Sequence, residues 1–148
     1  MPPYMSIATL LFLVTVLLSA CAAPNSQMFT KSVSSPTLYD NYFIAHDGVC
    51  LPIRTWRSNS PAPKAIIIAV HGFNDYSNFF KAPGSFLAKK NITTYAYDQR
   101  GFGAAPKPGL WPGVPNLTND LMSLTSLVQA RHPKVPVYLL GESMGGGV

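Results

Sequence analysis

The sequence predicts an α/β fold with a mostly parallel sheet, and two observations point to this class. Three uncharged runs rich in β-branched, aliphatic and aromatic residues are typical of strands buried on both faces of a parallel sheet; they lie at 65–70, 93–97 and 135–140. Segments with helical spacing of apolar residues separate these runs. Because strands that alternate with helices build parallel βαβ units, we expect one such domain over residues 39–148.

The N-terminal segment is predicted to be a signal peptide. Ile7 to Leu18 is a run of twelve mostly aliphatic residues, too short to span a bilayer and of signal-peptide length. The following Leu18-Ser19-Ala20-Cys21 resembles the lipobox of bacterial lipoproteins, although the leader MPPYMS lacks Lys and Arg. The resemblance implies a signal over residues 1–21, a lipid on Cys21, and, from Ala22, the outer membrane facing the periplasm. An ordinary cleaved signal and a membrane anchor of about 20 residues remain alternatives.

A linker and a hairpin are expected next. Residues 22–38 are rich in Ser, Pro, Asn and Thr, which is typical of a flexible tether. Residues 42–45 and 51–57 flank an Asp47-Gly48 pair and predict a β-hairpin. If Cys21 carries lipid, Cys50 has no disulfide partner, and we expect it to be packed in its apolar stretch.

Two helices are expected between the buried strands. Residues 78–90 show helical spacing of apolar side chains, but Pro83-Gly84 interrupts it, so this helix is expected to start late. Residues 116–131 form the better helix, and Pro133 ends it. Its apolar stripe consists of Leu117, Leu121, Leu124, Leu127 and Val128.

The charge pattern excludes one class of partner. The chain of 148 residues has a formal net charge of +5, but Lys89-Lys90 is its only adjacent basic pair and no basic stripe alternates with aromatic residues. Nucleic-acid binding is therefore not expected. The basic residues predict a solvated surface with a mild attraction for anionic lipid headgroups.

A G-x-S-x-G pattern follows the third strand, at Gly141-Glu142-Ser143-Met144-Gly145. In a nucleophile turn, a sharp passage from strand to helix holds the serine in a strained backbone at the tip of the sheet, and the glycines prevent collisions. A phosphate loop would need a Lys after its glycines, and none is present. The remaining alternative is a plain glycine-rich connection. The pattern therefore predicts that Ser143 is a nucleophile.

The other two strand ends carry motifs as well. His71-Gly72-Phe73 follows the first strand, and Asp98-Gln99-Arg100-Gly101-Phe102-Gly103 follows the second. Together with the serine turn, in this order and spacing, they resemble the α/β-hydrolase superfamily, and more narrowly the monoacylglycerol lipase and lysophospholipase-like group. The resemblance runs from about residue 42 to 148. It departs from the lipase group at Asp75-Tyr76, where an acidic residue and a histidine often stand, and at Ala105, where a serine is common.

The resemblance implies the N-terminal part of an α/β-hydrolase fold and a serine hydrolase of carboxylic esters, with acylglycerol or lysophospholipid-like substrates. It implies Ser143 as the catalytic nucleophile, the backbone N–H groups of Phe73 and Met144 as the oxyanion hole, and no metal or organic cofactor. Residues implied to support these motifs are His71, Gly72, Asp98, Arg100, Gly101, Gly141 and Gly145.

A serine nucleophile also needs a histidine held by a carboxylate, and in this fold both follow the serine. Only Met, three Gly and Val follow Ser143. His46 is expected in the hairpin turn, His71 in the oxyanion loop and His132 at the end of the long helix, so none is expected to act as the base. We therefore expect the acid and the histidine beyond Val148, only trace activity in this chain, and a bare apolar edge on the third buried strand.

Two other functions remain open. The domain could be a non-catalytic, membrane-tethered binding lipoprotein, or a peptidase or small-ester esterase of the same superfamily. Serine at position 143 argues against the haloalkane dehalogenase and epoxide hydrolase branches, whose nucleophile is Asp. The oligomeric state is left open.

Overall fold

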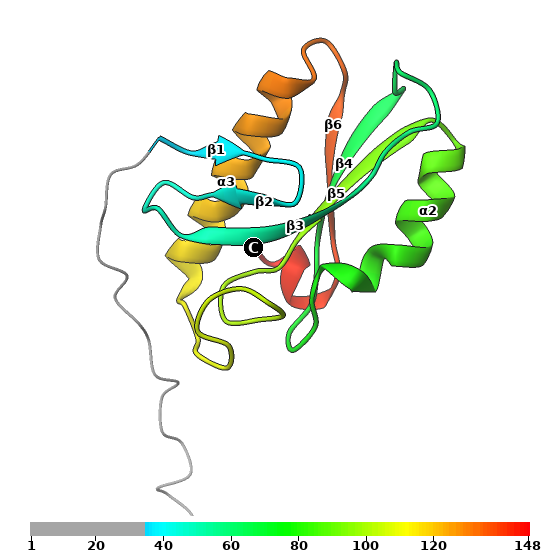
Figure 1. Ribbon diagram of the computed structural model, residues 1–148. Helices are drawn as coiled ribbons and strands as arrows, with labels where there is room; N and C mark the ends of the chain where they lie inside the picture. Colours follow the sequence, from blue (N-terminus) through cyan, green and yellow to red (C-terminus); the bar gives the residue numbers. More distant parts are fainter. Residues whose placement is uncertain (1–34) are drawn as a thin grey trace, which may run out of the picture.

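An antiparallel hairpin opens the structure. In the computed structural model, which describes residues 35–148, β1 (Thr37–Leu38) pairs with β2 (Tyr42–Ile44), and β2 pairs with β3 (Cys50–Trp56) (Figure 1). The predicted hairpin is confirmed. Its turn is closed by the Gly48 N–H, which donates to the Ala45 carbonyl over 2.9 Å. The sheet begins at Thr37, inside the segment predicted as a tether.

Three parallel strands form the rest of the sheet. β4 (Ala65–Val70) lies between β5 (Ile92–Tyr97) and β6 (Val137–Gly141) and is parallel to both. β3 pairs antiparallel with β5, so the strand order is β1-β2-β3-β5-β4-β6. The predicted α/β class is confirmed. The sheet is mixed rather than mostly parallel, because the N-terminal hairpin extends it beyond β5.

Helices cover both faces of this sheet. α2 (Lys81–Lys89), which follows the 3-10 turn η1 (Ser77–Phe80), packs on β3 and β5, and α3 (Val114–Arg131) lies on the other face (Figure 1). The chain leaves β4 toward β5 on one side and later crosses to β6 on the other. The carboxyl ends of β4 and β6 therefore flank a point where the winding reverses, and ligands bind at such points in open α/β sheets.

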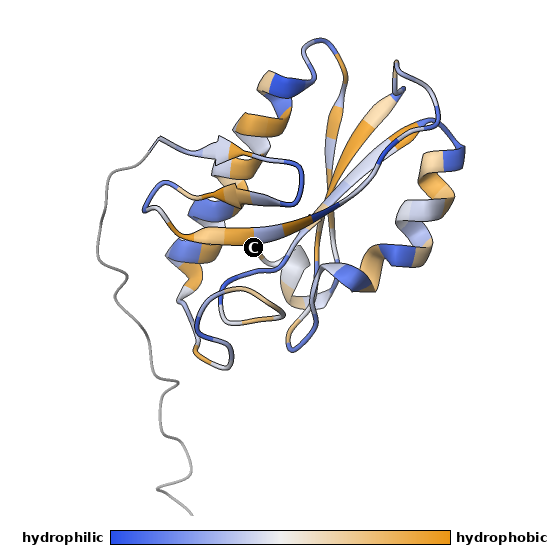
Figure 2. Cartoon of the chain, viewed as in Figure 1, coloured by the Kyte–Doolittle hydropathy of each residue, from blue (hydrophilic) through white to orange (hydrophobic). Residues whose placement is uncertain are grey.

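Most of the hydrophobic core lies between the sheet and α3. The predicted apolar stripe of α3 faces it, with Leu117, Leu121, Leu124 and Val128 buried and Leu127 packed beside them. A smaller cluster on the α2 side contains Ala69, Phe80 and Ala96. Hydrophobic residues run along the central strands in Figure 2.

The prediction of a late start for α2 is confirmed, but Pro83 does not interrupt the helix. α2 begins at Lys81, so Pro83 lies in its first turn, where a missing N–H breaks no hydrogen bond. The helix continues through Gly84. A Cβ atom on Gly84 would lie 2.6 Å from the Trp56 ring, so glycine lets α2 pack closely on β3.

Two expectations about burial are wrong. β6 is not buried on both faces, since Tyr138, Leu139 and Leu140 are exposed and no other described strand pairs with its outer edge. The expected bare apolar edge is thereby confirmed. Cys50 is exposed rather than packed, because the alternation along β3 turns Leu51 and Ile53 toward the core and Cys50 away from it.

Among residues 35–148, no helix combines the length and the hydropathy that a membrane crossing requires. The predicted signal segment, Cys21 and most of the tether lie outside the described residues.

Candidate active site

Ser143 stands in a strained turn between β6 and the 3-10 helix η2 (Ser143–Gly146). Its φ is +48°, in the left-handed region that residues other than glycine rarely adopt. The preceding Glu142 is extended, with φ −107° and ψ 128°. The chain therefore passes from strand to helix within one residue, and Ser143 is exposed at the carboxyl end of β6.

Two glycines allow this turn to form. A Cβ atom on Gly141 would overlap the backbone of Gly145 and Gly146, and one on Gly145 would overlap the Val70 carbonyl. The Glu142 N–H donates to the same Val70 carbonyl over 3.0 Å. The spacing of small residues in the motif thus follows from the close approach of η2 to the end of β4.

The loop after β4 lies against the serine. A Cβ atom on Gly72 would lie 3.2 Å from Ser143 Cβ and would overlap the Glu142 carboxylate. The next backbone N–H, that of Phe73, has no hydrogen-bond partner within residues 35–148, and neither has that of Met144. The two N–H groups predicted as oxyanion donors are therefore unpaired and belong to the two loops that meet at Ser143.

His71 fixes this loop from behind. Its Nε2 accepts a hydrogen bond from the Gln99 N–H over 3.0 Å, so Nδ1 carries the proton and donates it to the Gly72 carbonyl over 2.8 Å. The Gln99 side-chain amide donates to the His71 carbonyl over 2.8 Å. Burial lowers the pKa of His71 and favours the neutral ring. Both ring nitrogens are thus engaged, and His71 joins the end of β4 to the end of β5.

Asp98 fixes the start of η1 and the loop between β5 and α3 in the same way. Its buried carboxylate accepts hydrogen bonds from the N–H groups of Ser77 and Ala104, both over 2.9 Å. A Cβ atom on Gly103 would overlap this carboxylate, and one on Gly101, whose φ is +81°, would overlap the Leu110 carbonyl. The Asp98 motif therefore shapes the loop between β5 and α3.

Arg100 is the centre of a buried ion triad behind that loop. Its guanidinium makes two hydrogen bonds to Asp47, at 2.6 and 2.8 Å, and two to Asp120, at 2.6 and 2.7 Å. Burial raises the pKa of Asp120, the charge of Asp47 adds to the rise, and together they outweigh the hydrogen bonds and charge of Arg100. Burial also acts to raise the pKa of Asp47, but the hydrogen bonds and charge of Arg100 outweigh it and lower that pKa. The triad joins the hairpin turn, the end of β5 and α3.

A cavity of about 490 Å³ opens among these loops. Phe102 packs edge-to-face on His71 and on Phe73, with ring centroids 5.6 and 5.5 Å apart. Ser143 is not among the lining residues, but Phe73, which lines the cavity, directly follows the Gly72 that lies against Ser143. Its apolar lining is suited to the hydrophobic part of a substrate and consists of Phe73, Tyr76, Phe102, Pro108, Leu110 and Trp111.

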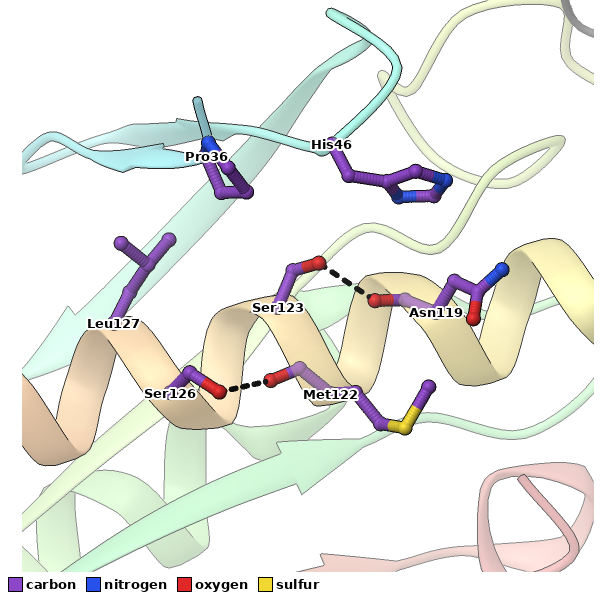
Figure 3. Close-up of a pocket in the computed structure, with 7 residues that line it drawn as sticks. All are labelled: Pro36, His46, Asn119, Met122, Ser123, Ser126 and Leu127. Atoms are coloured by element: carbon purple, nitrogen blue, oxygen red, sulfur yellow. Dashed lines mark hydrogen bonds between the residues drawn. The ribbon is translucent and has the colours of Figure 1, made fainter. Parts of the chain in front are cut away.

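A second cavity of about 490 Å³ lies between the hairpin turn and α3, with His46 over one side and Ser123 and Ser126 on the helix (Figure 3). Both hydroxyls donate to helix carbonyls, Ser123 to Asn119 over 2.8 Å and Ser126 to Met122 over 3.0 Å. Their protons are thereby directed into the helix rather than into the cavity.

His132 ends α3, and its Nε2 lies 2.8 Å from the Tyr95 hydroxyl. It therefore stands at the opposite end of β6 from Ser143. No hydrogen bond within residues 35–148 joins a histidine to Ser143. That none of the three serves as the base stays a prediction. In the same part of the chain, no three His, Cys, Asp or Glu side chains are grouped so that they could hold a metal ion.

Comparison with known proteins agrees with this geometry. Residues 61–148 match the family described as serine aminopeptidase, S33. The chain belongs to this family of α/β hydrolases. Monoglyceride lipase from Rattus norvegicus is 30% identical over 108 residues, which cover 72% of this chain and 35% of that protein.

Solved structures of this α/β-hydrolase fold resemble the chain. A soluble variant of monoglyceride lipase from Saccharomyces cerevisiae, in complex with a substrate analog, aligns with a TM-score of 0.64 and 23% identity over 84% of this chain and 41% of its own. A carboxyl esterase from Bacillus coagulans in complex with glycerol aligns with a TM-score of 0.63 and 22% identity over 74% of this chain and 38% of its own. The chain thus spans well under half the length of these proteins.

Three residues that shape the site are missed by sequence reasoning. Gln99, Asp47 and Asp120 hold the loops in place but belong to none of the expected functional sets. Asp120 has a signal in the sequence, since it lies between Leu117 and Leu124 on the apolar stripe of α3 and is buried there. A buried carboxylate on such a stripe needs a cationic partner.

Proposed function

We propose that this chain carries the nucleophile and the oxyanion hole of a serine hydrolase that cleaves carboxylic esters. The observation that carries the proposal is the strained turn of Ser143 beside Gly72, with an unpaired N–H group in the residue that follows each of the two. The Ser143 hydroxyl attacks the ester carbonyl, and the N–H groups of Phe73 and Met144 stabilise the oxyanion that forms. One such donor is typically worth about 3 kcal/mol to the transition state.

The substrate class proposed is an acyl ester of the acylglycerol or lysophospholipid type. The apolar cavity lined by Phe73, in the loop that reaches Ser143, supports a hydrophobic substrate, because aromatic and aliphatic side chains dominate its lining. The similarity to rat monoglyceride lipase supports the same class.

The histidine and carboxylate that activate Ser143 are proposed to come from outside residues 35–148. Within the described chain both ring nitrogens of His71 are engaged, and His132 bonds to Tyr95. Removal of triad residues in serine hydrolases costs up to about six orders of magnitude in kcat, so we expect only trace esterase activity from the purified 148-residue chain. Substantial activity that is lost in Ser143→Ala would contradict this part of the proposal.

Covalent labelling by a fluorophosphonate tests the nucleophile, because this reagent reacts only with an activated serine. The native protein, extracted from the membranes of its source, should be labelled, and Ser143→Ala should abolish the signal. Ser126→Ala is the matched control, since Ser126 is an exposed serine on α3 and its loss should leave labelling unchanged. Absence of labelling in the folded native protein would favour the non-catalytic binding lipoprotein.

A peptidase is the second candidate, and the description of the matched family as serine aminopeptidase favours it. Hydrolysis by the native protein of acyl esters of graded chain length, compared with aminoacyl amides, separates the two. Preference for longer acyl esters supports the lipase-like function, preference for amides supports the peptidase, and equal use of short esters supports a small-ester esterase.

The membrane anchor is a separate proposal that rests on the sequence alone. We propose that Cys21 is lipidated after removal of residues 1–20 and that Ala22 directs the protein to the outer membrane. Cys21→Ser should release the protein from the membrane fraction. The intact mass of the native protein checks the lipid directly, and an unmodified cysteine would reject the anchor.

A further inference from the structure

Two phenylalanines are exposed on η1 and α2. Phe79 and Phe86 are 47% and 60% exposed. At 3.6 residues per turn, Phe86 lies about 160° around the helix from Gly84 and from Ala88, which are buried on the sheet side. Phe86 therefore points away from the sheet, where neither β3 nor β5 can cover it.

Basic residues border Phe86. Lys89 and Lys90 follow it by three and four residues, so both lie on its side of the helix. Both are exposed, and Lys90 Nζ lies 5.7 Å from the centroid of the Phe86 ring. Hydrophilic residues occupy both ends of α2 in Figure 2, and hydrophobic residues lie between them. We call Phe79, Phe86, Lys89 and Lys90 the outer α2 face.

No carboxylate in this stretch of sequence balances the positive charge. Between Tyr76 and Tyr97 the chain has no Asp or Glu. Three of the six acidic residues of the chain, Asp47, Asp98 and Asp120, are buried and engaged elsewhere. A surface that only needs to be solvated can carry both signs of charge, whereas this stretch carries positive charge alone.

We propose that the outer α2 face docks on a lipid surface that contains anionic headgroups. Exposed aromatic side chains bordered by lysines are the pattern by which a helix lies in the membrane interface. The rings enter the boundary between headgroups and acyl chains, while the lysine stems reach along it and place their ammonium groups at the phosphates. Each lysine near an anionic surface contributes about fivefold to the affinity.

Docking by this face would also bring the cavity to the lipid, and this consequence rests on the proposed function. Phe73 and Tyr76 are exposed, line the cavity and directly precede η1. Figure 1 shows the loop after β4 leading through η1 into the first turn of α2. An acyl ester leaving the lipid surface would therefore meet Tyr76 and Phe73 at the cavity.

Tryptophan quenching in vesicles tests the docking with the full chain. Phe86→Trp places a reporter on the outer α2 face, and Met122→Trp places a matched reporter at an exposed residue of α3, on the other side of the sheet. Vesicles contain brominated lipid and either phosphatidylcholine alone or equal parts of phosphatidylcholine and phosphatidylglycerol. An N-terminal anchor would bring both variants to the membrane equally, so only contact with the bilayer separates their quenching.

Docking predicts that the added emission of Phe86→Trp shifts to the blue and is quenched in the anionic vesicles, whereas that of Met122→Trp is not. Adding Lys89→Gln to Phe86→Trp should raise the lipid concentration needed for half-maximal quenching about fivefold. Adding Lys134→Gln, at an exposed turn after α3, should leave that concentration unchanged. Equal quenching of the two reporters, or quenching that is indifferent to phosphatidylglycerol, would overturn the proposal.

The two proposals fail separately. Ser143→Ala should leave the quenching of the Phe86→Trp reporter intact. Quenching without any fluorophosphonate labelling would reject the hydrolase and keep the docking surface, and labelling without quenching would reject the docking surface alone.

Discussion

At the scale of single residues, the turn around Ser143 depends on which neighbours have no side chain. Gly145→Ala should destabilise the fold by about 1–3 kcal/mol, because its Cβ would collide with the fixed Val70 carbonyl. Urea unfolding of the full chain measures the change in free energy.

Gly146→Ala is the control in the same helix. Its nearest contact would be the Gly141 carbonyl at 3.8 Å, an ordinary van der Waals distance, so we expect no loss of stability. If both substitutions lower the free energy of unfolding equally, the loss reflects the flexibility of η2 and not its close approach to β4.

The burial of His71 predicts how the free energy of unfolding depends on pH. Its pKa in the folded protein lies below the ordinary value of 6.5, because burial penalises the charged ring. As the pH falls below 6.5 the unfolded chain takes up a proton that the folded chain does not, so the free energy of unfolding should decrease until the pH passes the folded pKa.

The variant His71→Gln isolates this contribution, since His132 has the same sign of shift and remains in both proteins. The pH dependence of urea unfolding should be shallower in the variant by up to about 1.4 kcal/mol per pH unit. A slope equal to that of the wild type, or an NMR titration of His71 at its ordinary pKa, would contradict the buried, neutral state assigned to its ring.

Residue roles could be predicted from the sequence only where a short motif fixes them locally. Ser143 and its flanking glycines lie within five residues, and their conformation follows from that spacing. The role of His71 depends on Gln99 in the loop after β5, which local pattern does not reveal. Arg100 was expected to support a turn, but its two carboxylate partners lie 53 and 20 residues away.

At the scale of elements, the packing of α2 on β3 is set by the absence of a side chain at Gly84. Gly84→Ala should lower the free energy of unfolding by about 1–3 kcal/mol, although alanine is the better helix former, because the new methyl would press on the Trp56 ring. Thermal unfolding measures the change.

Ser85→Ala is the matched control, since Ser85 is exposed on the same helix and should change stability little. The double variant Gly84→Ala and Trp56→Leu should recover part of the loss by making room. Equal stability of Gly84→Ala and the wild type would show that Trp56 moves away at no cost.

Element types could be predicted well, and their limits less well. Apolar spacing located both helices and all three parallel strands, because each must present a continuous hydrophobic surface. Pro83 was misleading, since proline breaks a helix interior but not a first turn, and the sequence pattern did not fix where that turn lies. The exposure of Cys50 depends on which face of β3 meets the core.

At the scale of the whole molecule, the outer edge of β6 is the feature most open to association. Its backbone groups on that side pair with no other described strand, and Leu139 is 57% exposed beside Tyr138 and Leu140. We expect the 148-residue chain to self-associate, and Leu139→Lys should reduce the associated fraction seen in sedimentation velocity.

Met122→Lys is the control for hydrophobicity alone, because Met122 is 59% exposed but lies on α3 rather than on a strand edge. It should leave association unchanged. A monomeric wild-type chain, or equal relief by both variants, would show that the β6 edge is not the cause.

The overall architecture could be predicted from the alternation of strands and helices, but the burial of β6 could not. A run such as Val137 to Leu140 has the composition of a central strand, and composition cannot state which elements pair with it. Within residues 35–148 it pairs with β4 alone, which leaves its side chains exposed.

The ends of β4 and β5 are secured from behind by three sets of buried polar contacts: His71 with Gln99, Asp98 with the N–H groups of Ser77 and Ala104, and Arg100 with two carboxylates. The tips of the same loops, such as Asn74 and Pro108, reach into the cavity without taking part in these contacts. The residues that hold the loops in place are thus different from the residues at the loop tips. A directed-evolution library confined to the loop tips should therefore contain a high proportion of folded members while it varies the lining of the cavity. Proteins of this fold can change their substrate in the same way, by substitutions at the tips alone.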